Sequence, residues 1–230
     1  MKRNTLVKQG FATKAIHGGY SENTFGALTA PIYQTSTFIF DSAEQGGRRF
    51  ALEENGYIYS RLGNPTSATV EEKLALLEGA EDAVVTASGM GAISSALWTA
   101  LKCGDHVLAS DTLYGCTFAL LMHGLTKFGI EVTLVDMSNL DAVRKALRKN
   151  TRVVYLETPA NPTLKLIDIK AVSTLAHEAS NAMVMVDNTF CTPYIQQPLT
   201  LGADVVLHSA TKYLNGHGDV IAGAVCGTTD

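Results

Sequence analysis

The sequence has few cysteines, and their spacing excludes the commonest uses of that residue. Four occur in 230 residues, and no two of them form a C-x-x-C pair: Cys103, Cys116, Cys191 and Cys226. A structural zinc site needs closely spaced ligands of this kind, so we predict no metal centre. Scattered free thiols are typical of a reducing compartment, which predicts a cytoplasmic protein.

Excess charge and long apolar runs are also lacking. The formal net charge is -4, which predicts no basic surface for nucleic acid or for an anionic membrane. No apolar run approaches the length that crosses a bilayer, and the polar start leads into no signal-peptide core. With 46% hydrophobic and 17% charged residues, the composition is that of a folded globular protein.

The glycine fingerprint of dinucleotide-binding enzymes is incomplete. Gly89 and Gly91 have the right spacing, but Ser94 stands where the third glycine is required, and no Walker lysine follows. Small residues between a strand and a helix nevertheless let backbone amides approach an anion at the helix N-terminus. A tight strand–helix turn is the commoner explanation of the same residues.

Two regimes of hydrophobic patterning divide the chain near Asn64. Residues 1–64 show little periodicity and predict an extended arm, whereas Pro65 opens a pattern of amphipathic helices and short β-branched runs. Strands that are apolar on both faces, separated by helices, indicate an α/β fold with a mostly parallel seven-stranded sheet between helices. The predicted strands are 83–87, 106–110, 132–136, 152–157, 183–187, 205–209 and 221–226. The predicted helices between them include 91–101, 117–127, 140–147 and 169–179.

Candidate functional residues follow the strands of this predicted sheet, where ligands of such folds bind. Lys212 follows a short apolar run and stands beside Ser209 and Thr211. A dry, polar-lined pocket there would lower the pKa of the amine and suit a Schiff-base lysine, although a solvated surface lysine is the commoner case. Asp187 closes another apolar run and either caps a turn or holds a cofactor ring nitrogen protonated.

Three further polar residues follow strands. Tyr114 either stacks on a cofactor ring and exchanges a proton or is a partly buried core tyrosine. Cys116 is an inert thiol unless it lies in the pocket. Asn161 lies between two prolines, Pro159 and Pro162, which suits an amide aimed at a cofactor oxygen or serves turn rigidity alone.

In the N-terminal arm, Tyr59 and Arg61 alternate onto one side of an extended segment. A phenol and a guanidinium in this arrangement form a strong phosphate clamp, and a generic surface arm is the alternative. Trp98, in the middle of a predicted helix, is expected in the core.

Taken together, these motifs resemble the Cys/Met-metabolism family of fold-type I enzymes, which depend on pyridoxal phosphate. The resemblance rests on the ordered segments 59–66, 88–90, 157–162, 186–189 and 209–213. It implies that Lys212 bonds to the cofactor, that Asp187 pairs with the pyridine nitrogen, and that Tyr114 stacks on the ring. It further implies cofactor contacts from Asn161, from the amides of Gly89 and Met90, and from the hydroxyls of Ser209 and Thr211.

The resemblance also has consequences for assembly. It implies that residues 1–64 contribute to a neighbouring subunit, where Tyr59 and Arg61 reach the cofactor phosphate, so a homodimer or, more commonly, a homotetramer is expected. Residues 65–230 would form the cofactor-binding domain. Members of the family run to nearly twice this length, with a C-terminal domain that supplies an arginine for the substrate carboxylate and is absent from these residues.

Cys116, two residues after the stacking tyrosine, resembles the branch of the family that cleaves methionine. The implied reaction is α,γ-elimination of L-methionine, a small sulfur amino acid, to methanethiol, 2-oxobutanoate and ammonia. Lys212 would move the α-proton, Tyr114 would protonate the leaving sulfur, and Cys116 would tune Tyr114. The alternatives are a cystathionine γ-lyase or γ-synthase, an O-acyl-homoserine sulfhydrylase, a non-catalytic cofactor-binding fragment and, least favoured, a nicotinamide dehydrogenase.

Overall fold

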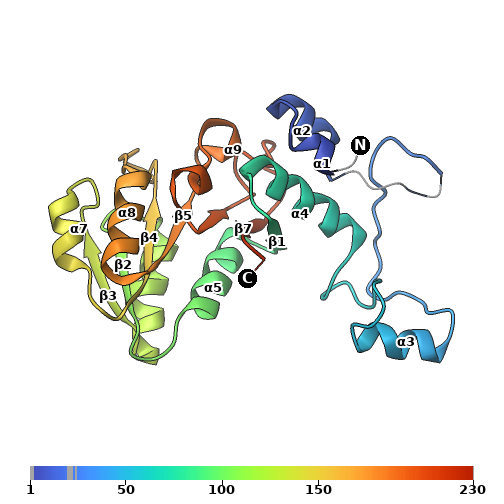
Figure 1. Ribbon diagram of the computed structural model, residues 1–230, viewed down its shortest axis with the longest axis horizontal. Coiled ribbons are helices and arrows are strands. Elements are labelled where there is room, and N and C mark those ends of the chain that lie inside the picture. The colour runs from blue at the N-terminus through green and yellow to red at the C-terminus, as the bar shows by residue number, and fades with distance from the viewer. Residues whose placement is uncertain (1–2, 20–22, 24, 230) are drawn as a thin grey trace. The chain divides into compact units, whose positions relative to one another are not determined.

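The computed structural model describes residues 3–19, 23 and 25–229 (Figure 1). The chain divides into two compact units, which we call the N-terminal unit (Met1–Leu76) and the C-terminal unit (Leu77–Asp230). The division falls near the end of helix α4 (Pro65–Glu78), whereas the change in sequence pattern predicted a boundary before that helix begins. No helix among the described residues is long and apolar enough to cross a membrane.

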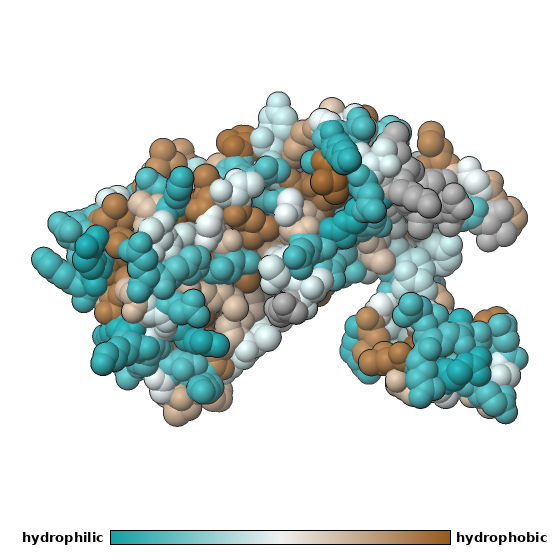
Figure 2. Space-filling model, viewed as in Figure 1, coloured by the Kyte–Doolittle hydropathy of each residue, from teal (hydrophilic) through white to brown (hydrophobic). Residues whose placement is uncertain are grey.

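The N-terminal unit, where the sequence predicted an extended arm, also contains three short helices among its described residues. The structure places α1 at Arg3–Leu6, α2 at Phe11–His17 and α3 at Ala43–Phe50. Helix α3 begins after Ser42, whose hydroxyl accepts the N–H of Gln45, and its residues are mainly hydrophilic on the face shown in Figure 2. The helix thus begins at a local N-cap within the segment predicted to be extended.

The C-terminal unit is built on the predicted seven-stranded sheet, in the order β1-β7-β6-β5-β4-β2-β3. Strands β1 to β6 run in one direction, and only β7 is antiparallel to its two neighbours, so the sheet is mostly parallel as expected. The strands are β1 (Asp82–Thr86), β2 (His106–Ser110), β3 (Glu131–Val135), β4 (Thr151–Glu157), β5 (Met183–Asp187), β6 (Val205–His208) and β7 (Gly223–Gly227).

Strand β4 shows why the sheet is covered on both faces. Val153 and Tyr155 pack into one apolar cluster, whereas Val154 and Leu156 pack into a second cluster on the opposite face. All four side chains are fully buried, as expected for a central parallel strand. The first cluster is completed by helix α5 (Gly89–Ala100), and the second by α7 (Leu140–Ala146) and α8 (Ile169–Ser180).

The helix predicted at 117–127 is irregular in the structure. It consists of α6 (Gly115–Ala119), a π-helical turn (Leu120–Gly124) and a 3-10 turn (Leu125–Phe128). Trp98 was expected in the core, but its side chain is 43% exposed and packs edge-on against Phe128, with ring centroids 4.9 Å apart. On α5 the buried face is taken by Ile93 and Leu97, which leaves Trp98 at the edge of that face.

Candidate active site

A cavity of about 240 Å³ lies at the carboxyl ends of the strands in the C-terminal unit. Its lining brings together eight of the predicted site residues: Gly89, Met90, Tyr114, Asn161, Asp187, Ser209, Thr211 and Lys212. The lining also contains six residues that the sequence argument did not select for a role: Ser88, Ile93, Glu157, Thr189, Phe190 and Ile221. Six separate strand ends or loops thus converge on one pocket, as the parallel topology requires.

Asp187 ends β5 and is 6% exposed at the floor of the pocket. Its Oδ1 accepts the hydroxyl of Thr189 at 2.5 Å and the backbone N–H of Thr189 at 3.1 Å. Its Oδ2 accepts only a longer contact, 3.5 Å, from the hydroxyl of Tyr155. Burial raises the pKa of Asp187, and the hydrogen bonds from Thr189 offset part of that rise. A buried carboxylate with one weakly engaged oxygen favours a cationic N–H partner.

The start of α5 forms a cradle of small residues. Ser88 caps the helix, because its Oγ accepts the N–H of Gly91 at 2.9 Å, and the first N–H groups of a helix have no intrahelical acceptor. Gly89 packs closely against Ser209: a Cβ at position 89 would lie 2.6 Å from the Cβ of Ser209 and 2.8 Å from its Cα. Only glycine permits this approach, which leaves helix amides and a serine hydroxyl close together, as an anion site requires.

Thr211 and Lys212 differ from expectation. The hydroxyl of Thr211 donates to the carbonyl of Ala222 at 3.2 Å and accepts the N–H of Ala222 at 3.1 Å, so it is already engaged with the backbone. Lys212 lines the pocket, but its side chain is exposed, which corrects the prediction of a dry surrounding for this amine. The physical reason is that the residue lies beyond the end of β6, in a turn after the last buried position, His208.

Tyr114 and Cys116 contact each other at the beginning of α6. The thiol of Cys116 lies 3.4 Å from the phenolic oxygen of Tyr114 and is placed to donate to it. The neighbouring Cys116 raises the pKa of Tyr114, because negative charge on the sulfur would oppose negative charge on the phenolic oxygen, so the phenol keeps its proton and suits a proton donor better than a base. Tyr114 is 42% exposed and lines the pocket, which excludes the core-tyrosine alternative; Cys116 is exposed beside it.

Glu157 was treated as no more than a strand end in the sequence, yet its carboxylate joins two loops of the pocket. Its Oε2 accepts the backbone N–H of Tyr114 at 2.7 Å, and its Oε1 accepts the backbone N–H of Asn161 at 2.8 Å. Burial and the neighbouring Asp187 raise the pKa of Glu157 to about 7. The sequence did contain a signal for Glu157, because it is an acid at the end of an almost wholly apolar strand. Charged groups are rarely buried unless they have a partner or a function.

Tyr59 and Arg61 lie in the N-terminal unit. The guanidinium of Arg61 stacks over the ring of Tyr59, with its central carbon 4.9 Å from the ring centroid. This cation–π contact holds the two side chains together. The segment is fixed within its own unit by the bridge between Tyr59 and Thr37. Their contact with a cofactor phosphate stays a prediction.

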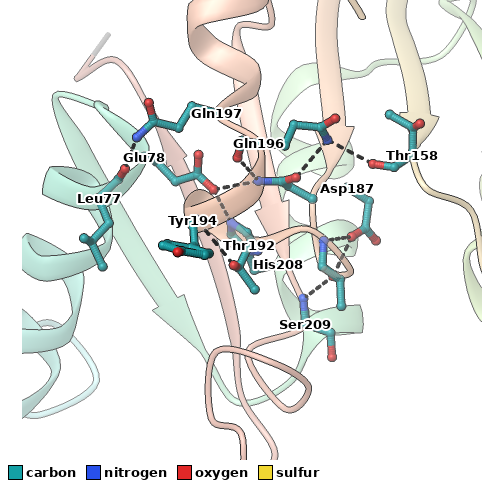
Figure 3. A network of polar contacts seen from close by, with 12 residues as sticks. Leu77, Glu78, Thr158, Asp187, Thr192, Tyr194, Gln196, Gln197, His208 and Ser209 are labelled. Atoms are coloured by element: carbon teal, nitrogen blue, oxygen red, sulfur yellow. Dashed lines mark hydrogen bonds and ion pairs between the residues drawn. The ribbon is translucent and has the colours of Figure 1, made fainter. Parts of the chain in front are cut away.

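A buried polar network lies beside the pocket and joins the loops after three strands (Figure 3). Glu78 and His208 are both fully buried, with Oε1 and Nε2 2.5 Å apart, and Asn188 donates to the same Oε1 at 3.0 Å. The side-chain amide of Gln196 donates to Asn188 at 2.9 Å and to the carbonyl of Thr158 at 3.0 Å. Because Asn188 follows Asp187 directly, this network fixes the backbone that carries the acid.

Replacing Glu78 by alanine is expected to lower the free energy of unfolding by about 3–5 kcal/mol. The change leaves His208 and the amide of Asn188 buried without their shared acceptor. Urea denaturation followed by circular dichroism measures the loss, with Glu178→Ala on the exposed face of α8 as the control. A loss below about 1 kcal/mol would show that the network does not hold the sheet and the loops together.

Comparisons with known proteins agree with the geometry. Residues 12–230 match the family model described as Cys/Met metabolism PLP-dependent enzyme. The chain is 70% identical over 218 residues to an L-methionine gamma-lyase of Fusobacterium nucleatum subsp. polymorphum, covering 95% of this chain and 55% of the relative. It is 65% identical over 230 residues to an L-methionine gamma-lyase of Porphyromonas gingivalis, covering 100% of this chain and 58% of the relative.

One solved structure of similar fold carries the cofactor on a lysine. It is a putative O-acetylhomoserine (thiol)-lyase from Campylobacter jejuni with N'-pyridoxyl-lysine-5'-monophosphate, which matches with a TM-score of 0.91 at 37% identity. The match covers 97% of this chain and 55% of that chain. The chain spans about half the length of the curated relatives it matches.

The chain belongs to the family of PLP-dependent enzymes of cysteine and methionine metabolism, as the sequence motifs predicted. The residues of the pocket fit that cofactor on two observations. Asp187 presents a buried, weakly engaged oxygen suited to a ring N–H, and the close packing of Gly89 on Ser209 leaves an anion cradle at the start of α5. Lys212 lines the same cavity, so an amine is available there for such a cofactor.

Proposed function

We propose that the full protein eliminates methanethiol from L-methionine and releases 2-oxobutanoate and ammonia. The strongest support is the 70% and 65% identity to two L-methionine gamma-lyases over nearly the whole chain. The Tyr114–Cys116 contact at the pocket adds a structural reason, because it keeps a proton on the phenol that has to protonate a leaving thiolate. The substrate is thus a small sulfur amino acid.

In this proposal each residue of the pocket has a distinct task. When bound, pyridoxal phosphate supplies an electron-withdrawing ring that stabilises negative charge at the substrate α-carbon. Lys212 would hold the cofactor through its amine, and the same amine would accept the substrate α-proton. Asp187 would accept a hydrogen bond from the ring nitrogen and keep it protonated. Tyr114, which lines the pocket, would donate its proton to the departing sulfur.

The phosphate is assigned to the cradle at the start of α5. The amides of Gly89 and Met90 would donate to its oxygens, with the helix dipole favouring negative charge, and Ser209 would add its hydroxyl. Thr211 would join them only by exchanging its hydrogen bonds with Ala222 for bonds to the phosphate. Asn161 would meet the cofactor from the loop after β4.

Replacing Gly89 by alanine is expected to raise the dissociation constant of pyridoxal phosphate at least about tenfold. The new Cβ would overlap Ser209, so the turn after β6 would have to move away from the helix amides that hold the phosphate. Fluorescence titration of the apoenzyme measures the affinity. Gly47→Ala is the control, because a Cβ at that helical position in α3 meets nothing within 4 Å. Unchanged affinity would place the phosphate elsewhere.

Assembly and location complete the proposal. Tyr59 and Arg61 would reach the phosphate of a neighbouring subunit, so residues 1–64 act as an arm in a homodimer or homotetramer. The stacked pair fits this use, because a guanidinium held by an aromatic ring presents its N–H donors to one side. The four described cysteines are free thiols, which suits the cytoplasm.

Product analysis on the full gene product with added pyridoxal phosphate tests the proposal against its rivals. The assay supplies L-methionine, L-cystathionine, or O-acetyl-homoserine with a thiol in separate reactions. Methanethiol and 2-oxobutanoate together from L-methionine support the lyase. 2-Oxobutanoate from cystathionine without methanethiol from methionine would transfer the assignment to a cystathionine enzyme. Turnover of the acyl-homoserine alone would indicate a sulfhydrylase, and cofactor binding without any turnover a non-catalytic protein.

A further inference from the structure

The carboxylate of Glu157 connects two loops that lie on the pocket. Glu157 is the last residue of β4 and is 4% exposed. One of its oxygens accepts the backbone N–H of Tyr114, which lies 43 positions earlier, and the other accepts that of Asn161. Both distances, 2.7 and 2.8 Å, are those of strong charge-assisted hydrogen bonds.

We propose that Glu157 is a positioning residue, whose carboxylate fixes Tyr114 and the 158–162 loop relative to each other at the cofactor site. The proposal rests on the proposed function, because Tyr114 is the proton donor of that reaction. Glu157 itself contacts no reacting atom in this scheme. It acts through the backbone of the two residues that it ties together.

The surroundings of Glu157 argue against a merely stabilising role. Among the described residues it has no lysine, arginine or histidine within 4.0 Å, so its burial is not compensated by an ion pair. It also pairs in register with Asp187 on β5, which places two acids side by side on the same face of the sheet. An apolar or amide residue would avoid this electrostatic cost, whereas only a carboxylate offers equal acceptors to two N–H groups.

Protonation would release one of the two loops. Burial and Asp187 raise the pKa of Glu157 to about 7, so the side chain titrates near neutral pH in the free protein. Above that pKa both oxygens accept; below it, one oxygen carries a proton and becomes a donor facing an N–H. The titratable groups around it are Asp187 on β5, Tyr155 on β4, and Tyr114 and Lys212 on the loops of the same pocket.

Glu157→Gln tests the proposal, because glutamine keeps the shape and one acceptor but turns an NH₂ group toward the other N–H. We expect kcat for L-methionine to fall at least tenfold while KM and cofactor affinity change less than threefold. The visible circular dichroism of the bound cofactor should also change, since Tyr114 no longer holds one position against the ring. Glu178→Gln, on the exposed face of α8, should match the wild type.

A double-mutant cycle shows whether Glu157 acts through Tyr114. In a Tyr114→Ala background, Glu157→Gln should lower kcat less than twofold further, because the side chain that it positions is gone. The acid limb of the wild-type kcat profile, where activity falls as pH falls through the pKa of Glu157, should be absent in Glu157→Gln. The proposal would be overturned if Glu157→Gln lowered kcat equally in the Tyr114→Ala background. It would also be overturned if Glu157→Gln alone kept the kcat and the circular dichroism of the wild type.

The circular dichroism separates failure of this inference from failure of the proposed function. It reports on the bound cofactor without any substrate. If the wild type releases no methanethiol, the proposed function fails, yet an altered cofactor signal in Glu157→Gln but not in Glu178→Gln still supports the positioning role. An unaltered signal overturns that role whatever the substrate.

Discussion

Lys212→Ala is expected to lower turnover of L-methionine by at least about a thousandfold. In the proposed mechanism the variant loses both the amine that would bond to the cofactor and the base that would move the α-proton. The exposed position of Lys212 beyond β6 means that alanine leaves no cavity, so the melting temperature of the apoenzyme should be nearly unchanged. Steady-state release of 2-oxobutanoate and the absorption spectrum of the bound cofactor measure the two losses.

Two further lysine variants make the Lys212 result specific. Lys212→Arg keeps the positive charge but cannot bond to an aldehyde at neutral pH, so it should be nearly as inactive as Lys212→Ala. Lys170→Ala, on the exposed face of α8, should retain full turnover. Turnover within tenfold of the wild type in Lys212→Ala would show that another group removes the α-proton.

Asp187→Asn is expected to lower turnover by at least about a hundredfold while the cofactor still binds. Asparagine can accept the hydrogen bonds from Thr189 through its carbonyl oxygen, but it brings no charge to hold the ring nitrogen protonated. The ring would then withdraw electrons less strongly from the α-carbon. Stopped-flow turnover and the absorption maximum of the bound cofactor check both parts.

The stability of the apoenzyme provides the control for Asp187. Burial raises the pKa of Asp187, so its ionised form disfavours the folded state, and stability falls as pH rises through that raised pKa. Asp187→Asn removes this dependence and should not lower the melting temperature at neutral pH. Asp187→Glu, which keeps the charge, should retain more activity than Asp187→Asn. The opposite order would show that shape, and not charge, is what the ring requires.

The sheet could be predicted from the sequence, and so could the convergence of the site residues on one pocket, because both follow from local patterns. The runs His106–Ser110 and Met183–Asp187 have apolar interiors that contain valine, and the structure places strands β2 and β5 at these same bounds. Once the strands are parallel, their carboxyl ends meet at one edge. Asp187 and Lys212 therefore had to lie near a common pocket, although neither is close to the other in the sequence.

What the sequence could not predict depends on contacts between distant residues. The bond from Tyr114 to Glu157 joins positions 43 apart, and the pair of Glu78 and His208 joins positions 130 apart; no periodicity signals either. Helix α3, by contrast, had a local signal in the N-cap residue Ser42, which was overlooked. The exposure of Lys212 was also missed, because an apolar run predicts a buried strand but not the surroundings of the residue beyond it.

Chemical trapping of the cofactor tests the central claim most directly, namely that this pocket holds pyridoxal phosphate on Lys212. The protein is loaded with the cofactor, reduced with borohydride, digested and mapped by mass spectrometry. We predict one stable pyridoxyl phosphate adduct, on the peptide that contains Lys212, and none in Lys212→Ala. An adduct on a different lysine, or none in the wild type, would contradict the assignment of the pocket.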